Sequence, residues 1–439
     1  MTRSRLLALG IALALADSSV VTLALPDILR RFDLEIADVA WVLTIYNLGL
    51  AVSAVPAAYA ARRRPVTAFV GGTLVFASAS LVCGLAPSFA WLLTGRGVQA
   101  VGGALLVCAA LELLSELEHS DGEAVRIWAA AGIAGAALGP AVGGILTQTL
   151  GWESIFFVQA PLSLLTLAAA RGVSRASHRA PAGRPSIPSN LALLLLSGAL
   201  TAALFLLVLL LVDGWRMSPI AAGVVVTVMP LAAVASRSLG SRLHNPSIRA
   251  ATGAILIAGG LGALAVLPGA SWVWAVPPQL LIGAGLGLAI SALTERALVG
   301  REPQAVHGGW TIAARHAGVV LGLLLLTPVF TSSLDTYRHK ALEAGAAAVL
   351  DSRISPTAKI TLAQDVLSEV SAAQGELPDL SRAFVDRPQT VDYQSLEETL
   401  VDQLKRGITA AFRAPFALAA LLALLALVPI AVGRREVGS

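Results

Sequence analysis

The chain has 439 residues, of which 56% are hydrophobic and only 13% are charged, and its formal net charge at pH 7 is +4. So apolar a composition excludes a soluble globular domain and indicates a polytopic membrane protein. The positive charge does not indicate nucleic-acid binding, because the arginines cluster in short loops between apolar runs, as they do on the cytoplasmic side of membrane proteins.

Apolar runs of the ~20 residues needed to cross ~30 Å of hydrocarbon recur along the chain. The first run could be a signal peptide that ends at Ala14-Leu15-Ala16, but its apolar character continues past Asp17 to Leu25. We therefore interpret it as a membrane span. In chain order, the predicted spans lie at 5–28, 38–60, 67–86, 90–113, 125–148, 154–171, 190–212, 218–238, 250–268, 273–295, 309–331 and 408–432.

These spans predict an all-α membrane protein with two six-helix bundles, at 1–171 and 190–439, joined by a linker at 172–189. The linker region carries several arginines and no acidic residue, which is typical of a cytoplasmic loop. The basic loop Arg62-Arg63-Arg64 falls on the same side. We therefore expect both termini to be cytoplasmic, in the plasma (inner) membrane.

Residues 332–406 form a long segment that this topology places outside the cell. It holds twelve acidic and eight basic residues, and helical periodicity is present at 359–370 and 395–404. Three interpretations remain open: a cap over the cavity mouth, an outward extension of the last span, or a solvated spacer.

Asp17 lies near the middle of the first predicted span. An ionisable group at that depth costs at least ~2.5–3.5 kcal/mol, so it requires a partner, a wet cavity or a proton. Asp17 is the leading candidate for a proton-binding site. The alternative is a packing carboxylate that accepts hydrogen bonds from hydroxyl groups such as those of Ser18 or Thr44.

Other polar residues inside the spans are candidates for a transport site. Arg96 lies in the fourth span, where its side chain can reach a central cavity or else extend back to the interface. Thr44 and Asn47 in the second span and Gln279 in the tenth are candidate neutral contacts for a substrate.

Small residues line one face of the fifth span. Gly135, Gly139 and Gly143 recur every four residues, and Pro140 removes a backbone hydrogen bond beside them. This pattern predicts close helix packing, either as a surface that slides or as a static contact.

In the eleventh span, Arg315 and His316 are adjacent. Neighbouring positions on a helix point ~100° apart, so we expect that the two cannot both face one cavity. We assign them a gating or secondary role, with His316 structural or interfacial rather than a proton relay. The second half of the cavity is then expected to be apolar and nearly uncharged.

Several motifs together resemble the major facilitator superfamily, and the first half resembles its drug/proton antiporter branch. They begin at Leu15-Ala16-Asp17-Ser18-Ser19 and at Trp41-Val42-Leu43-Thr44-Ile45-Tyr46-Asn47. They continue at 96–103, at 135–144 and at Gly151-Trp152-Glu153-Ser154, with looser matches at 214–223 and 314–322.

This resemblance implies roles for particular residues. The arginine that matches Arg96 is implicated in proton coupling, so we expect Arg96 to modulate the charge of Asp17 and Gln99 to orient water or substrate. The stretch from Gly135 to Gly144 matches the antiporter signature, which implies export.

The chain departs from the family in two ways. The loop after the second span lacks the usual latch aspartate and reads Ala60-Ala61-Arg62-Arg63-Arg64. In addition, the branch usually has fourteen spans, two more than are counted here.

The sequence thus predicts a proton-coupled exporter that works by alternating access. Its expected substrate is a lipophilic small molecule, which can be cationic. We also expect contacts with membrane lipids and a monomeric state. Two alternatives stay open: a lipid exporter with the same fold, and a non-transporting membrane receptor. No Walker-type loop, metal-ligand cluster or catalytic triad is present in the sequence, so neither an enzyme nor a cofactor, a metal or a nucleic-acid partner is expected. Cys83 and Cys108 lie in apolar runs and are assigned no chemistry.

Overall fold

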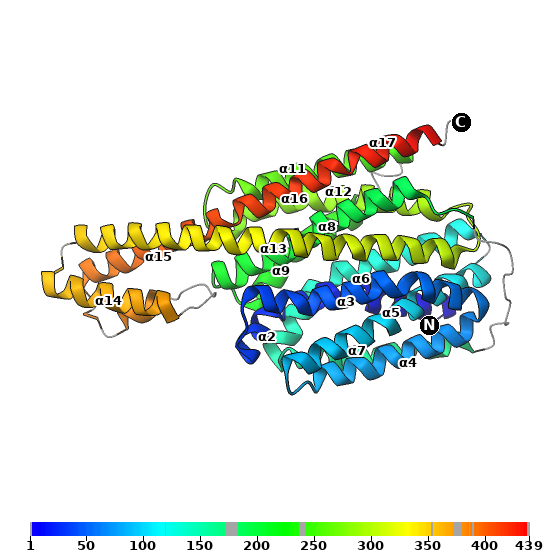
Figure 1. Ribbon diagram of the computed structural model, residues 1–439, viewed down its shortest axis with the longest axis horizontal. Coiled ribbons are helices and arrows are strands. Elements are labelled where there is room, and N and C mark those ends of the chain that lie inside the picture. Colours follow the sequence, from blue (N-terminus) through cyan, green and yellow to red (C-terminus); the bar gives the residue numbers. More distant parts are fainter. Residues whose placement is uncertain are drawn as a thin grey trace.

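The protein is an elongated bundle of helices, seen in a computed structural model (Figure 1). The structure describes residues 2–118, 120–171, 183–236, 243, 245–352, 354–372, 380–385, 387–388 and 390–436. Within these residues, eleven helices are long and apolar enough to cross a membrane, and the 17-residue helix Pro219–Ala235 is a shorter apolar one. The predicted all-α polytopic fold is confirmed.

The first half contains the first six spans. Its third and fourth spans pack along each other, as do its first and fifth. The helices are α1 (Arg3–Thr22), α2 (Leu25–Phe32), α3 (Ile36–Arg63), α4 (Pro65–Gly84), α5 (Phe89–Leu117), α6 (Asp121–Leu150), α7 (Glu153–Leu165) and η1 (Thr166–Ala170).

The second half repeats this arrangement and adds an outer domain. Its helices are α8 (Ile187–Leu209), η2 (Leu210–Gly214), α9 (Pro219–Ala235), α11 (Pro246–Ala265), α12 (Trp272–Leu298), α13 (Gln304–Asp351), α14 (Pro356–Ala372), η3 (Leu380–Phe384), α15 (Val391–Ala411), α16 (Arg413–Leu425) and α17 (Leu427–Glu436).

Helix starts follow local capping chemistry. The hydroxyl groups of Ser88, Ser120 and Ser218 accept hydrogen bonds from backbone N–H groups in the first turns of α5, α6 and α9. Each cap satisfies one of the free donors at a helix N-terminus. These serines therefore fix where three spans begin.

Two boundaries differ from the sequence prediction. The first span, expected at 5–28, ends at Thr22, and Pro26 lies in the first turn of a separate helix, α2. The eleventh span, expected at 309–331, runs from Gln304 to Asp351 as one helix, because the Ala- and Leu-containing sequence beyond the apolar run favours continued helix.

The two halves meet along two pairs of helices. In the first, α3 packs along α13, and in the second, α6 packs along α9. A Cβ added at Gly309 of α13 would lie 2.6 Å from the Cβ of Ala58, and one at Gly144 of α6 would lie 2.6 Å from the carbonyl oxygen of Pro219. The interface therefore depends on close backbone approach.

Each half also contains the same two glycine contacts. In the first half, Gly139 of α6 packs on α1, and in the second, Gly318 of α13 packs on α8. Likewise, Gly102 lies between α5 and α4, and Gly285 lies between α12 and α11. Equivalent spans in the two halves thus use equivalent glycines, as expected of two structural repeats.

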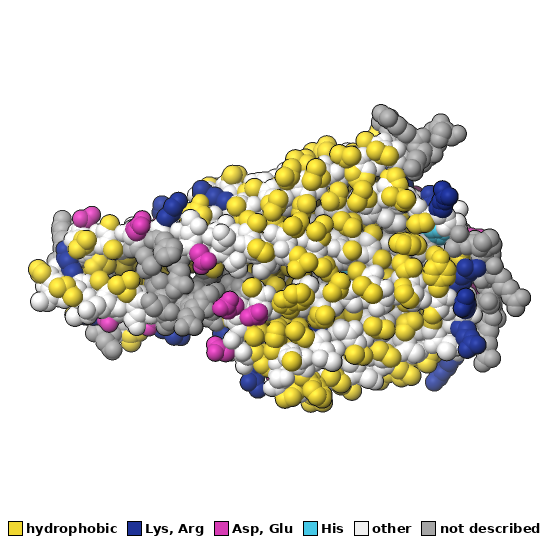
Figure 2. Space-filling model, in the orientation of Figure 1, with side chains coloured by type: hydrophobic (Ala, Val, Ile, Leu, Met, Phe, Trp, Pro, Cys, Tyr) yellow, Lys and Arg dark blue, Asp and Glu magenta, His cyan; other side chains and the backbone are white. Residues whose placement is uncertain are grey.

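The surface separates into regions by residue type. On the face shown in Figure 2, apolar side chains cover the middle of the bundle, Lys and Arg side chains gather at one end, and acidic side chains lie toward the other. We call the end rich in Lys and Arg the basic end. It is defined by Arg62, Arg63, Arg64, Arg249 and Arg301. An apolar belt between two polar ends is the surface that a bilayer requires.

The outer domain lies at the end of the bundle opposite the basic end (Figure 1). It comprises the far part of α13 together with α14, η3 and α15, and it has its own apolar core, which includes Leu362, Phe384, Leu396 and Leu400. The helical periodicity seen in the sequence at 359–370 and 395–404 is confirmed in α14 and α15. The domain is therefore a folded unit.

The glycine contact between α13 and α8 gives a stability prediction. A Cβ added at Gly318 would lie 1.9 Å from the carbonyl oxygen of Leu194, so we expect Gly318→Ala to lower the free energy of unfolding by about 1–3 kcal/mol. Gly259→Ala is the matched control, because no atom lies within 4 Å of its added Cβ. Thermal unfolding midpoints in detergent measure both, and equal midpoints would contradict this packing.

Candidate functional site

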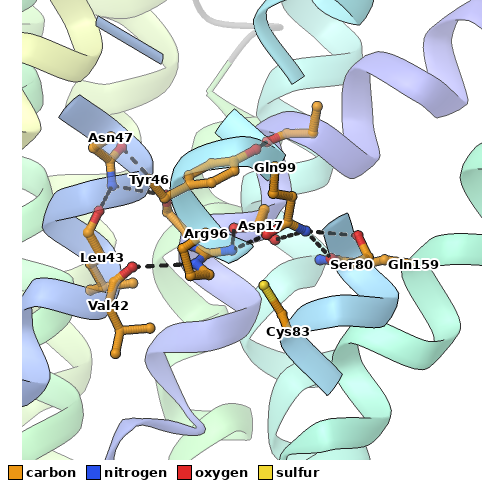
Figure 3. A network of polar contacts seen from close by, with 12 residues as sticks. Asp17, Val42, Leu43, Tyr46, Asn47, Ser80, Cys83, Arg96, Gln99 and Gln159 are labelled. Carbon is orange, nitrogen blue, oxygen red and sulfur yellow. Dashed lines mark hydrogen bonds and ion pairs between the residues drawn. The ribbon is translucent and has the colours of Figure 1, made fainter. Parts of the chain in front are cut away.

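A buried ion pair joins Asp17 of α1 to Arg96 of α5. The Arg96 Nη1 atom contacts the Asp17 Oδ2 atom, and both side chains are 0% exposed (Figure 3). Breaking such a pair from one side leaves an uncompensated charge in the interior, which costs several kcal/mol. Each residue therefore depends on the other for its place in the interior.

Gln99 connects the ion pair to two further helices. Its Oε1 atom accepts a hydrogen bond from Arg96 Nη1 at 2.7 Å. Its Nε2 atom lies 2.8 Å from Ser80 Oγ of α4, 3.0 Å from Gln159 Oε1 of α7 and 3.3 Å from Asp17 Oδ1 (Figure 3). A change of charge at Asp17 would therefore alter hydrogen bonds that join α1, α4, α5 and α7.

Two aromatic rings and one backbone oxygen also contact Arg96. Its Cζ atom lies 4.2 Å from the ring centroid of Tyr46 and 5.7 Å from that of Phe156. Its Nε atom donates to the carbonyl oxygen of Val42 at 3.3 Å. Cation–π contacts of this kind stabilise a desolvated guanidinium. The alternative that Arg96 extends to the membrane interface is wrong.

A cavity of about 160 Å³ lies between the two halves, beside the ion pair. Ser18 and Asn47 line it, and they directly follow Asp17 and Tyr46 in the sequence. The wall that α1 and α3 present to the cavity thus has the ion pair immediately behind it. Most of the remaining lining is apolar and includes Leu43, Leu204, Met229, Leu286 and Ile290.

Asn47 links the halves across this cavity. Its Nδ2 atom donates to the carbonyl oxygen of Leu43 at 2.7 Å, which orients the amide, and its Oδ1 atom lies 2.7 Å from His316 Nδ1 of α13. Because a carbonyl oxygen only accepts, this orientation places a proton on His316 Nδ1. Ser18 Oγ also contacts Asn47 at 3.1 Å. One amide therefore ties α1, α3 and α13 together.

Arg315 and His316 both line the cavity. The expectation that they could not share one cavity is wrong, because side chains that point ~100° apart on α13 both border this cavity. The expectation of a nearly uncharged second half is also wrong, because the guanidinium of Arg315 belongs to that wall.

The other candidate contacts for a substrate have partners away from the cavity. Gln99 is buried in the ion-pair network, and the hydroxyl of Thr44 donates to the carbonyl oxygen of Ala40 at 2.9 Å. Gln279 Nε2 donates to the carbonyl oxygen of Ala275 at 3.1 Å. None of these three side chains lines the cavity in the described structure. The geometry thus lends no support to a substrate-binding role for them.

Gln279 is the counterpart of Arg96 in the second half. Arg96 lies six residues before Gly102, and Gln279 lies six residues before the equivalent Gly285. Gln279 Oε1 is buried without a hydrogen-bond partner among the described residues. The charged site of the first half is therefore replaced by a neutral one in the second.

The glycine face of the fifth span packs against α1. A Cβ added at Gly135, Gly139 or Gly143 would lie 2.0–2.3 Å from atoms of Ala12, Ser19 or Val20. Pro140, on the same helix, lines the cavity. The stripe therefore holds the helix that carries Asp17, while α6 contacts α9 of the other half at Pro140, which faces Gly223, and at Gly144.

A carboxylate closes the basic end between the halves. Glu112 of α5 is buried, and its Oε2 atom accepts a hydrogen bond from the backbone N–H of Ala305 at 3.2 Å. Beside it, Ser115 Oγ donates to Gln304 Oε1 at 2.9 Å. A carboxylate at a helix N-terminus also interacts favourably with the helix dipole. Glu112 thus caps α13 from the opposite half.

Sequence reasoning missed four residues of this arrangement, namely Tyr46, Ser80, Glu112 and Gln159. Glu112 had a usable signal, because it is a carboxylate at the end of an apolar run. The other three are ordinary residues of a span until helix packing brings them to Arg96. Among the described residues, no group of three or more His, Cys, Asp or Glu side chains is placed to bind a metal.

Two repeated halves that face each other across a central cavity, with a buried ion pair beside it, define the architecture of a secondary transporter. Residues 7–335 match the Major Facilitator Superfamily, and the chain belongs to this family of transporters, which are not enzymes. The resemblance drawn from the motifs is confirmed.

The similarity to curated relatives covers only part of the chain. The multidrug resistance protein Stp of Mycobacterium tuberculosis is 37% identical over 179 residues, which cover 38% of this chain and 33% of Stp. The methylenomycin A resistance protein of Streptomyces coelicolor is 31% identical over 245 residues, which cover 55% of this chain and 50% of that protein. The chain thus spans a third to a half of the length of these relatives.

Among solved structures, a bacterial homolog of the human lysosomal transporter Spinster, in an inward-facing and unoccupied conformation, superposes with a TM-score of 0.64. The match covers 98% of this chain and 97% of the homolog at 15% sequence identity. At this identity the similarity establishes the fold.

The ion pair gives an asymmetric stability prediction. We expect Asp17→Asn to lower the free energy of unfolding by about 3–5 kcal/mol, because it leaves the guanidinium of Arg96 buried without a counter-charge. Arg96→Gln should cost less, since the carboxyl group of Asp17 can become neutral by taking up a proton. Thermal unfolding of both variants, the double variant and the exposed control Asp38→Asn measures this. Equal losses in the two single variants would contradict it.

The cap at the basic end gives a conformational prediction. We expect Glu112→Leu to shift the protein toward separation of the halves there, and Glu112→Gln to shift it less, because the amide oxygen can still accept from Ala305. Double electron–electron resonance spectroscopy measures the distance between the halves, with spin labels attached to cysteines that replace Arg126 and Glu302.

Glu295→Gln is the control for this measurement, because its ion pair with Arg249 lies within the second half. An unchanged distance distribution in Glu112→Leu would show that the carboxylate does not hold the two halves together.

Proposed function

We propose that the protein is a proton-coupled secondary transporter that exports lipophilic small molecules by alternating access of the central cavity. The observation that carries this proposal is the completely buried ion pair of Asp17 and Arg96, in which Asp17 immediately precedes Ser18 of the cavity wall. The names of the relatives, which include multidrug resistance and drug efflux proteins, support export of such molecules.

Protonation of Asp17 is the coupling step. When the carboxylate takes up a proton it loses its charge, and Arg96 keeps a positive charge that only Gln99, a backbone oxygen and two rings then stabilise. Because an unpaired buried charge is strongly unfavourable, α1 and α5 move until Arg96 gains other partners. The proton is released on the other side when Arg96 returns to Asp17.

The glycine contacts let this change move whole helices. Gly135, Gly139 and Gly143 join α6 to the helix of Asp17, and α6 also borders α9 of the second half. A displacement of α1 is therefore passed to the interface between the halves. At the basic end, the contact of Glu112 with α13 takes the place of the absent latch aspartate.

The orientation in the membrane follows from charge. The arginine-rich basic end lies in the cytoplasm with both termini, and the acidic outer domain lies outside the plasma (inner) membrane. Closure of the halves at Glu112 then corresponds to a cavity shut off from the cytoplasm.

Reconstitution in liposomes tests the function. With a pH-sensitive dye inside, we expect lipophilic compounds to drive proton movement in the wild type, and Asp17→Asn to abolish it because no carboxylate remains to carry the proton. The control Asp38→Asn, a change at the exposed start of α3, should behave as wild type. Proton movement that persists in Asp17→Asn would refute Asp17 as the carrier.

A further inference from the structure

Arg315 is the charged residue of the cavity wall. Among the described residues, none of the ion pairs, hydrogen bonds or ring contacts involves its side chain, and no Asp or Glu lines the cavity. A guanidinium has five N–H donors and stays charged. The cavity therefore presents a positive charge with unused hydrogen-bond donors.

The carboxylate of the first half does not compensate this charge. Asp17 is already paired with Arg96, it is 0% exposed, and it does not line the cavity. In the second half, Asp213 lies beside Arg30 and Glu295 pairs with Arg249, and neither carboxylate lines the cavity. A cationic substrate would thus meet a like charge in the cavity and no accessible counter-charge.

The remaining lining suits the rest of an amphiphile. Leucine, isoleucine and methionine side chains cover much of the wall, and hydroxyl groups of α8 at Ser197 and Thr201 lie in the same cavity as Arg315. His316 carries its Nδ1 proton toward Asn47, so it adds no negative charge. Apolar surface around a few polar groups is typical of a small-molecule site.

We infer that the cavity binds an amphiphile with a single anionic group, a carboxylate or a phosphate, which pairs with the guanidinium of Arg315 while its apolar part packs on the leucine-rich wall. This inference rests on the proposal that the cavity is the transport site, and it gives the substrate a charge opposite to the one favoured by the sequence. Arginine suits either group, since its planar fork binds two oxygens at once.

The anionic substrate also explains why the two arginines are arranged differently. Arg96 is paired with Asp17 inside the protein, whereas Arg315 is left for the ligand. The substrate then binds at Arg315 and the proton at Asp17, so a bound anion does not compete with the proton.

Equilibrium binding to the purified protein in detergent tests the site. Three tritiated probes share one ring system and differ in charge: 1-naphthaleneacetate, its neutral amide and 1-naphthylmethylammonium. A fourth probe, oleoyl lysophosphatidate, distinguishes a lipid phosphate from a small organic acid. We expect at least one of the two anions to bind saturably. If naphthaleneacetate binds, its affinity should be about tenfold higher than that of its amide, because one charge-assisted contact provides a difference of this size.

Variants assign the preference to one residue. Arg315→Gln should remove the preference for the anion, Arg315→Lys should retain most of it, and Arg126→Gln, which changes an exposed arginine at the basic end, should leave it unchanged. Size-exclusion profiles and thermal midpoints confirm folding in each case. Binding by lysophosphatidate alone identifies a lipid-type ligand and binding by naphthaleneacetate alone a small acid, and both support the site.

Two results would overturn the inference: no saturable binding of either anion, or anion binding that Arg315→Gln leaves unchanged. The same assay on Asp17→Asn separates this inference from the proposed function. If the anion binds but no proton movement occurs in liposomes, the anion site is supported and proton coupling is rejected. If only cations drive proton movement, the anion site is rejected and proton coupling is supported.

Discussion

The cost of holding the charge of Arg96 inside the bundle is the constraint on which the rest of the structure depends. The guanidinium cannot lose its proton, and the surrounding membrane offers no water to solvate it. It is therefore stabilised by a carboxylate from α1, an amide from its own helix, a carbonyl oxygen from α3 and two aromatic rings. Five of the six spans of the first half contribute to the network around this charge or border it.

The second half shows what the fold requires when that charge is absent. Gly253 and Gly285 preserve the close packing of α11 and α12, yet the position of Arg96 is occupied by Gln279, which bonds to its own helix. The repeats thus share their packing but not their chemistry. In the proposed mechanism the first half supplies the proton site at Asp17 and the second supplies Arg315 of the cavity wall for recognition, so the two halves divide coupling and recognition between them.

The sequence was sufficient for the all-α polytopic fold and for the family, and it singled out Asp17 and Arg96 as the residues of interest. Asp17 and Arg96 were identifiable because an ionisable residue in an apolar run must have a reason to be there. The partners of the pair were not identifiable, because Ser80, Gln159 and Tyr46 become significant only when helices rotate toward one another. The contacts of Gln99 with α4 and α7 could not be predicted for the same reason.

Other features depend on distances along helices that periodicity does not fix. The end of the first span at Thr22 follows from packing and from Pro26, although hydropathy continues beyond it. Glu112 resembles its neighbours Glu116 and Glu118 in the sequence, and only the approach of α13 makes it a cap. The ~100° angle between neighbouring helical positions predicted that Arg315 and His316 could not face one cavity. The prediction fails because both side chains border the same cavity.

The length of α13 has a mechanical consequence. Its 48 residues extend from the cap at Glu112 to the core of the outer domain, a distance of about 70 Å at 1.5 Å per residue. Such a helix acts as a lever: a tilt of about ten degrees around its basic end carries its far end through about 12 Å, by the same dimensions. In the proposed alternating-access cycle, the position of the outer domain relative to the bundle would therefore differ between the two states of the cavity, and a binder specific for one position would favour one state.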